Sequence, residues 1–253
     1  MIATDFWFWI LAGTATLFVG SSKGGLPLIG MLAVPLMALR ISPVVAAGLL
    51  LPIYIISDMY GLWIYRKSFD ARNVVILVPA AAIGIAVGWA TASITNEDVV
   101  TILVGAIGLA YCIDAVLKAR RNLPPRAADV PRGMFWGSLT GFTSFVSHAG
   151  APPYQMYVLP QRLEKMVYAG TSTIVFAIIN LLKLPPYWFL GQVNLDSLEI
   201  AAMLVPLALA GAYGGFRLTK ILPEKLFFRI VEVALFLVSL KLIYDGFSGL
   251  LVV

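Results

Sequence analysis

Six apolar runs of about twenty residues constrain this chain more than any other feature of its sequence. They cover residues 44–64, 74–94, 98–117, 166–183, 195–216 and 226–244. A helix of about 20 apolar residues crosses the hydrocarbon core of a bilayer and satisfies its own backbone hydrogen bonds there. Because 60% of the residues are hydrophobic and 12% are charged, a soluble core of this size could not bury all the apolar surface. The sequence therefore predicts an all-α polytopic membrane protein in contact with the lipid bilayer.

The chain also contains an internal repeat. Residues 21–27, SSKGGLP, match residues 146–152, VSHAGAP, at an offset of 125 residues; we call these segments the first break and the second break. Both interrupt an apolar stretch with glycine and proline, which do not continue a helix. The sequence therefore predicts two repeats joined by a linker, and each repeat is a broken-helix hairpin followed by three spans. The expected bounds are 1–117 for the first repeat with its hairpin at 6–39, 118–132 for the linker, and 133–253 for the second repeat with its hairpin at 133–161.

The basic residues predict a topology for these repeats. If each hairpin enters and leaves the membrane on one side, the three spans between the hairpins invert the second repeat. Fourteen basic residues then lie on one side, and only Arg40, Lys183 and Lys241 lie on the other. The positive-inside rule favours this arrangement, with both termini outside the cytoplasm, and it assigns the net charge of +5 to cytoplasmic loops rather than to a nucleic-acid partner. The first ten residues have no basic segment ahead of an apolar one, so we expect no cleaved signal peptide.

Interrupted helices at matching positions of inverted repeats point to the midplane binding site of a transporter. The offset that aligns the two breaks also aligns Lys23 with His148, the only histidine in the chain. Because a cation at membrane depth needs a partner and helix N-termini attract anions, the pair predicts an anionic ligand bound between the two hairpin tips. A lysine on a surface loop and a hydrogen-bonded core histidine remain the alternative. Hydroxyls and backbone amides near the tips would add donors to the anion, and the candidates are Ser21, Ser22, Gly24, Gly25, Ser144, Ser147 and Gly150.

Four further polar residues lie within the predicted spans. Asp58 and Asn180 occupy corresponding places in the first span of each repeat. An intramembrane carboxylate indicates a functional role, such as proton coupling or attraction of a basic partner, but both side chains also suit a hydrogen bond between helices. Thr171 and Ser172 either line the transport pathway or pack against a neighbouring helix. His148 is a second candidate for proton coupling, since histidine titrates near neutral pH.

Other classes of function lack the residues they need. A single cysteine, Cys112, and a single histidine exclude an internal disulfide and argue against a cysteine- or histidine-rich metal site. Ser147 adjoins His148, but neighbours in one chain rarely face each other for proton transfer, and no G-x-S-x-G motif is present. The sequence therefore predicts no enzyme, metal or cofactor. Glycines at four-residue spacing indicate close helix packing, namely Gly84 with Gly88, and Gly133 with Gly137 and Gly141.

The two breaks, in the contexts SSKGGLPLIGMLAVPL and VSHAGAPPYQMYVLP, are followed by AAG and YAG at the start of the next span. This pattern resembles the TauE/SafE family of sulfite exporters over nearly the whole chain. The resemblance implies a secondary transporter that exports small sulfur-containing anions, such as sulfite, sulfoacetate or other organosulfonates, across the inner membrane. Alternating access between the repeats would move the anion. The Ser-Ser-Lys segment departs from the more glycine-rich break of such proteins, so the identity of the anion stays open. The coupling ion and a homo-oligomeric state stay open as well. The alternative function is a permease for another solute or for a cation bound by Asp58.

Overall fold

The computed structural model describes residues 5–119 and 125–251. Every regular element in that part of the chain is helical, as the sequence predicts. Residues 1–4 and the linker residues 120–124 lie outside the described part, and so do the predictions that concern them.

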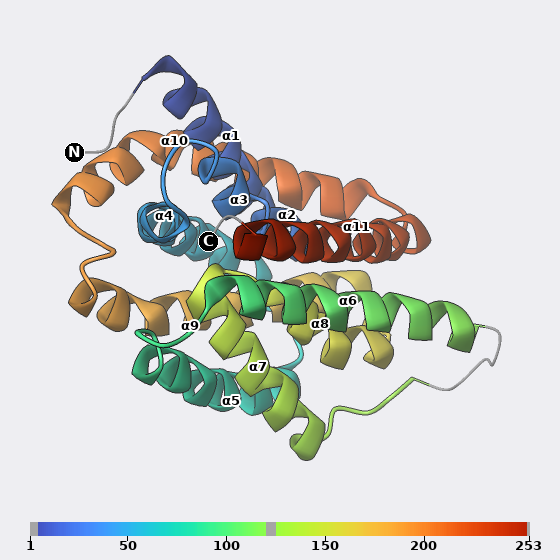
Figure 1. Cartoon of the computed structure of the whole chain (residues 1–253). Helices are drawn as coiled ribbons and strands as arrows, with labels where there is room; N and C mark the ends of the chain where they lie inside the picture. The colour runs from blue at the N-terminus through green and yellow to red at the C-terminus, as the bar shows by residue number, and fades with distance from the viewer. Residues whose placement is uncertain (1–4, 120–124, 252–253) are drawn as a thin grey trace. The chain divides into compact units, whose positions relative to one another are not determined.

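The chain forms two compact units, and each unit combines helices from both halves of the sequence (Figure 1). The first unit takes the residues up to Asp70 and the segment Lys165–Pro223, and the second takes Ala71–Glu164 and the residues from Glu224 onward. The first unit contains α1 (Phe6–Lys23), α2 (Pro27–Gly30), α3 (Ala33–Met37), α4 (Pro43–Tyr65), α9 (Lys165–Phe189) and α10 (Leu195–Ile221). The second unit contains α5 (Ala71–Ala90), α6 (Glu97–Ala119), α7 (Val130–Ser147), α8 (Ala151–Val158), the 3-10 turn η1 (Leu159–Gln161) and α11 (Glu224–Leu251). The units therefore differ from the predicted repeats, which stay a prediction.

Glycine contacts bring helices together within each unit. In the first unit α1 packs along α10, and α4 packs on α9 and α10; in the second unit α5 packs along α7, and α6 along α11 (Figure 1). A Cβ atom added at Gly20 of α1 would lie 2.2 Å from the carbonyl oxygen of Ala208 on α10. A Cβ atom added at Gly84 of α5 would lie 1.9 Å from the carbonyl oxygen of Ser138 on α7. Because no side chain fits at such distances, the predicted close-packing role of Gly84 is confirmed.

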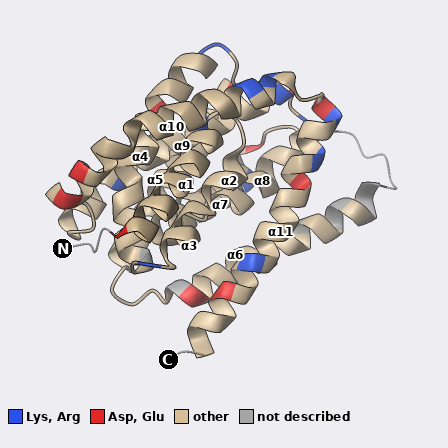
Figure 2. Cartoon of the chain, turned by 90° about the horizontal axis from the view of Figure 1, so that it is seen from above, with Lys and Arg blue, Asp and Glu red and all other residues tan. Residues whose placement is uncertain are grey.

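Four described helices are long and apolar enough to cross a membrane, namely Val44–Tyr65 within α4, and α5, α9 and α10. The other two predicted spans also form helices, α6 and α11, although these are not among the four. Charged residues are sparse along most of the helical ribbon (Figure 2). The helix that contains the predicted span 166–183 is α9, which continues beyond residue 183 to Phe189 with Pro185 and Pro186 inside it. Membrane-spanning helices tolerate proline where neighbouring groups satisfy the freed carbonyls.

At the first break, glycine and proline end one helix and begin another. The amide of Gly24 caps α1 by donating to the carbonyl oxygen of Gly20 at 3.2 Å. Gly25 follows with a φ of 117°, a conformation that L-residues with a Cβ rarely adopt. Pro27 then occupies the first turn of α2, where its missing N–H is not needed. The predicted hairpin at 6–39 thus consists of α1, the break, α2 and α3.

The second break uses a histidine where the first uses a glycine. α7 ends at Ser147, and His148 takes the left-handed conformation with a φ of 53°. Among the described residues, Arg162 is the other non-glycine residue with a positive φ. Such a conformation costs on the order of 1–3 kcal/mol and persists only where the surrounding structure imposes it. The strained residue is the one that the sequence singles out, although a left-handed residue occurs at position 25 in the first break rather than at the aligned position 23.

Candidate functional site

Lys23, the last residue of α1, is buried inside the first unit. The residue is 4% exposed, and Asp58 on α4 is fully buried. Nζ of Lys23 lies 2.8 Å from Oδ1 of Asp58, and it also lies 4.9 Å from the centre of the Tyr54 ring. The partner that a buried cation requires is therefore a carboxylate in the same unit.

Asn180 on α9 extends this ion pair to a third helix. Its Nδ2 donates to Oδ2 of Asp58 at 2.8 Å, so both carboxylate oxygens have partners. Asp58 and Asn180, which the sequence places at corresponding positions of the two repeats, are thus direct neighbours. Because removing one member of a buried ion pair costs about 3–5 kcal/mol, the contact holds the end of α1 against α4 and α9.

Lys183 is the functional candidate that the sequence analysis missed. The topology prediction assigns this lysine to the outer end of a span; in the structure it lies within α9 and is fully buried. It follows Asn180 by three residues, and residues at that spacing share one face of a helix. Lys183 interacts electrostatically with both Lys23 and Asp58. The i, i+3 spacing from Asn180 was the available sequence signal. We call Lys23, Asp58, Asn180 and Lys183 the charged cluster.

The other donors predicted at the first break have partners within the first unit. The hydroxyl of Ser22 donates to the carbonyl oxygen of Val19 at 2.6 Å, and that of Ser21 donates to Gly211 at 3.4 Å. The amide of Gly25 donates to the carbonyl oxygen of Ser22 at 3.3 Å. An anion would have to replace these bonds to use the same donors, so their binding role stays a prediction.

Two side chains also hold the carbonyl groups at the end of α1. Tyr65 on α4 donates its hydroxyl to the carbonyl oxygen of Gly24 at 2.6 Å. Thr173 on α9 donates to the carbonyl oxygen of Lys23 at 3.3 Å. Each unpaired buried carbonyl would cost about 1–3 kcal/mol, so these bonds stabilise the break and position the Lys23 backbone.

Thr171 and Ser172 lie at the start of α9 and are buried. Each hydroxyl donates to a carbonyl of its own helix, Thr171 to Val167 at 2.7 Å and Ser172 to Ala169 at 2.9 Å. Thr171 also accepts the backbone N–H of Asp70 at 2.9 Å. Thr171 thus connects the two segments of the first unit, while its predicted place on a transport pathway stays a prediction.

The second break contributes His148, Ser144, Ser147 and Gly150 to the second unit. His148 is 7% exposed, and its amide donates to the carbonyl oxygen of Ser144 at 3.2 Å. The hydroxyl of Ser147 donates to the carbonyl oxygen of Thr143 at 3.4 Å. Gly150 is the N-cap of α8 and makes no side-chain capping bond. The structure thus groups these residues at one helix junction, while the joint use of Lys23 and His148 stays a prediction.

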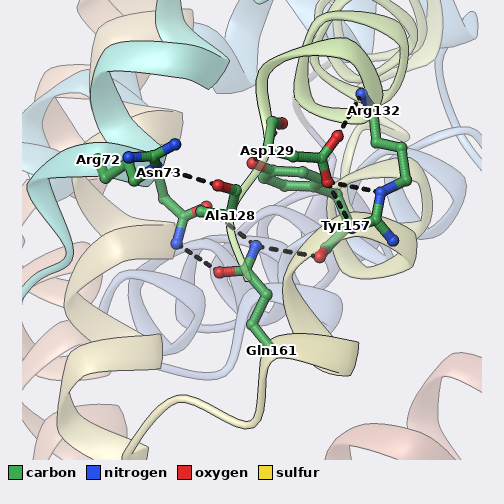
Figure 3. Close-up of polar contacts among 7 residues, drawn as sticks. All are labelled: Arg72, Asn73, Ala128, Asp129, Arg132, Tyr157 and Gln161. Carbon is green, nitrogen blue, oxygen red and sulfur yellow. Dashed lines mark hydrogen bonds and ion pairs between the residues drawn. The ribbon is translucent and has the colours of Figure 1, made fainter. Parts of the chain in front are cut away.

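A polar network in the second unit joins the start of α5 to the 3-10 turn η1 that follows α8 (Figure 3). Asn73 donates to Oε1 of Gln161 at 2.8 Å, and Gln161 donates back to Oδ1 of Asn73 at 3.0 Å. Nearby, Arg132 donates to Asp129 through its side chain at 2.5 Å and through its backbone amide at 3.0 Å. These bonds from Arg132 lower the pKa of Asp129 below its ordinary value. The network satisfies its members internally, which indicates a structural role.

Across the described residues, histidine, cysteine, aspartate and glutamate nowhere gather in a group of three or more that could hold a metal ion. Cys112 lies on α6 as a free thiol.

Long apolar helices, helix breaks and charged side chains buried within a helical unit together define a multi-pass membrane protein of the transporter class. The sulfite exporter TauE/SafE family model matches residues 9–242. The chain therefore belongs to the TauE/SafE family, whose members are transporters and not enzymes. Membership implies transport of sulfite or organosulfur anions. Searches of curated proteins and of solved structures gave no match.

Proposed function

We propose that this protein exports a small sulfur-containing anion, such as sulfite, sulfoacetate or another organosulfonate, and that the charged cluster binds it. The observation that carries the proposal is the burial of two lysines with one aspartate, which gives these three side chains a formal charge of +1. A positive excess in apolar surroundings is costly, and an anionic ligand removes that cost.

The ion pair between Lys23 and Asp58 supplies a mechanism for capture and release. The anion competes with the Asp58 carboxylate for the Lys23 ammonium group, so binding stays weak enough to be reversible. A carboxylate displaced from its cation in an apolar interior is costly, and taking up a proton removes the charge. Proton uptake at Asp58 thus couples to anion binding, and His148 is the corresponding titratable group at the second break.

Alternating access between two inverted repeats is the proposed transport cycle. The helix pairs support this symmetry, because exchanging each predicted repeat for the other turns the pair α1 and α10 into the pair α7 and α5. The same exchange swaps α4 with α9 and α6 with α11, so each of these two contacting pairs is preserved. We further propose the inner membrane as the location, with both termini outside the cytoplasm, since burial of Lys183 removes one of the three basic residues opposing that orientation.

Uptake of labelled sulfite and sulfoacetate into proteoliposomes tests the function. We expect saturable flux in the native protein and, at a sulfite concentration near its KM, clearly reduced flux in Lys183→Met, with Lys241→Met as the matched control. Lys241 pairs with Asp245 on α11 and is substantially exposed. Equal flux in both variants and the native protein would show that the charged cluster is not the binding site.

A cation permease using Asp58 is the competing function. Both oxygens of Asp58 already bind cationic or amide donors, Lys23 and Asn180, which leaves no carboxylate oxygen reserved for a metal or organic cation. Competition of labelled sulfite binding by inorganic cations at constant anion concentration distinguishes the two functions, and displacement by the cation would favour the permease.

A further inference from the structure

Gln155 is a buried amide whose polar atoms have no partner. It lies on α8, and the residue is 0% exposed. Neither Nε2 nor Oε1 has a hydrogen-bond partner within the described part of the chain. A buried donor or acceptor left unpaired opposes folding. A buried amide without a protein partner is therefore expected to form its hydrogen bonds with a ligand or with water.

Gln161, at the end of the same hairpin, shows what a structural amide looks like in this unit. Its Oε1 accepts from Asn73, and its Nε2 donates both to Asn73 and to the carbonyl oxygen of Tyr157, the last at 3.1 Å. Gln161 is 8% exposed. Two buried glutamines on one hairpin therefore differ in a single respect, since one is satisfied by the protein and the other is not.

Gln155 lies one turn after Ala151, near the start of α8 and the second break. Cα–Cβ bonds in a helix tilt toward the N-terminus, so a side chain covers the turn before its own Cα. The residue one turn earlier is Ala151, and Gly150 caps the helix, so only a methyl group and a hydrogen occupy these positions. Pro152 and Pro153 lack N–H groups and cannot serve as donors at this helix end. The Gln155 amide is thus one of the side-chain donors near the start of α8, together with the Tyr154 hydroxyl.

The first repeat has no equivalent of this side chain. The offset of 125 residues aligns Gln155 with Gly30, whose carbonyl oxygen accepts the Tyr54 hydroxyl at 2.7 Å. The first hairpin therefore folds without a polar side chain at this position.

We infer that Gln155 binds an oxyanion at the second break, within the second unit; that this oxyanion is the transported one rests on the proposed function. Its Nε2 donates to an oxygen of the sulfite or sulfonate group, and its Oε1 accepts from a water molecule that travels with the anion. A neutral amide contributes a hydrogen bond to a charged ligand without adding a charge. Gln155 is thus a substrate-contacting residue, and oxyanions are the ligand class it selects.

Matched methionine substitutions test the inference, because methionine keeps the length of glutamine without its polar atoms. We measure the dissociation constants of sulfite and of sulfoacetate by calorimetry, and the unfolding temperature without ligand, for Gln155→Met and Gln161→Met in detergent. Losing one hydrogen bond to a charged ligand weakens binding by about 10-fold or more. Gln155→Met should show this loss with an unfolding temperature equal to or above that of the native protein. Gln161→Met should lower the unfolding temperature and leave both dissociation constants unchanged.

The opposite pattern overturns the inference. If Gln155→Met lowers the unfolding temperature as Gln161→Met does while the native affinity is retained, Gln155 is a structural residue. If the native protein binds neither sulfite nor sulfoacetate, the proposed function fails and the inference fails with it. Native binding that survives in Gln155→Met rejects the inference alone.

Discussion

The Lys23 ammonium nitrogen lies 2.8 Å from Oδ1 of Asp58, in the interior of the first unit. The helix break thus supplies a cation that already has a counter-ion. An anion can bind there only by displacing or sharing Asp58, which makes affinity depend on the charge of that carboxylate. Under the proposed function, Lys23 sets the sign of the preferred ligand, and Asp58 limits how tightly that ligand binds.

A charge-removal cycle tests this relationship. Lys23→Met and Asp58→Asn each leave one buried charge alone, and we expect each to lower the free energy of unfolding by about 3–5 kcal/mol. The double variant removes both charges and should recover most of that loss. Denaturation in detergent measures stability, and proteoliposome flux of sulfite should be absent in every variant that lacks Lys23.

The interaction energy from the double-mutant cycle shows whether the Lys23 and Asp58 charges stabilise each other. A double variant that is as unstable as the sum of the single variants would show that the two charges do not stabilise each other. Normal flux in the double variant would remove the pair from the transport mechanism.

Lys183 should contribute to anion affinity through its charge. Lys183→Met removes one of the two buried lysine side chains of the charged cluster, and we expect the KM for sulfite to rise by about 10-fold, the effect of 1.4 kcal/mol. Lys183→Arg keeps the charge and should retain part of the affinity, because the larger guanidinium group fits the buried position poorly. Initial rates over a range of sulfite concentrations separate KM from maximal flux, and an unchanged KM in Lys183→Met would contradict the prediction.

Helix packing in the first unit predicts a contrast between two glycines. Gly20→Ala places a Cβ 2.2 Å from a backbone oxygen of α10, whereas Gly214→Ala on α10 meets nothing within 4 Å. We expect Gly20→Ala to destabilise the protein by about 1–3 kcal/mol through overpacking. Gly214→Ala should be neutral or stabilising by up to about 1 kcal/mol, as alanine is the better helix former. Thermal unfolding of the two variants side by side gives the comparison, and similar unfolding temperatures would refute it.

The sequence predicts the local features of this fold well, since each depends on neighbouring residues. Apolar runs of span length become helices, and Gly25 and Pro27 end one helix and begin the next. The ion pair of Lys23 with Asp58 depends on how α1 packs against α4, and no local pattern encodes that contact. The burial of Lys183 was not predicted, because the expected span 166–183 ends at this residue, whereas α9 continues through Pro185 and Pro186.

Gln155 escaped the sequence analysis for a different reason. It belongs to no recognisable motif and lies among apolar and aromatic residues in a short helix. Its significance depends on the absence of a hydrogen-bond partner, which only the folded structure reveals. The division into two units that mix both halves of the chain is equally a property of long-range packing.

Asp129 at the N-terminus of α7 predicts a pH dependence of stability. Hydrogen bonds from the side chain and the backbone amide of Arg132 hold the pKa of Asp129 below its ordinary value, which is about 3.9 in the unfolded chain. A carboxylate with a lowered folded-state pKa contributes stability above the unfolded value, and that contribution is lost as the pH falls through the folded value. Native protein should therefore lose more stability than Asp129→Asn between about pH 5 and pH 3.

Asparagine is the matched replacement because it caps a helix as well as aspartate does but does not titrate. The difference in unfolding free energy between native protein and Asp129→Asn cancels the acid effects of all other carboxylates, provided the sites are independent. We expect a difference below about 1 kcal/mol, since this ion pair is partly exposed to solvent. Parallel pH profiles for the two proteins would show that the ion pair with the Arg132 guanidinium adds no net stability, and the cap would then act through its hydrogen bond from the Arg132 backbone amide alone.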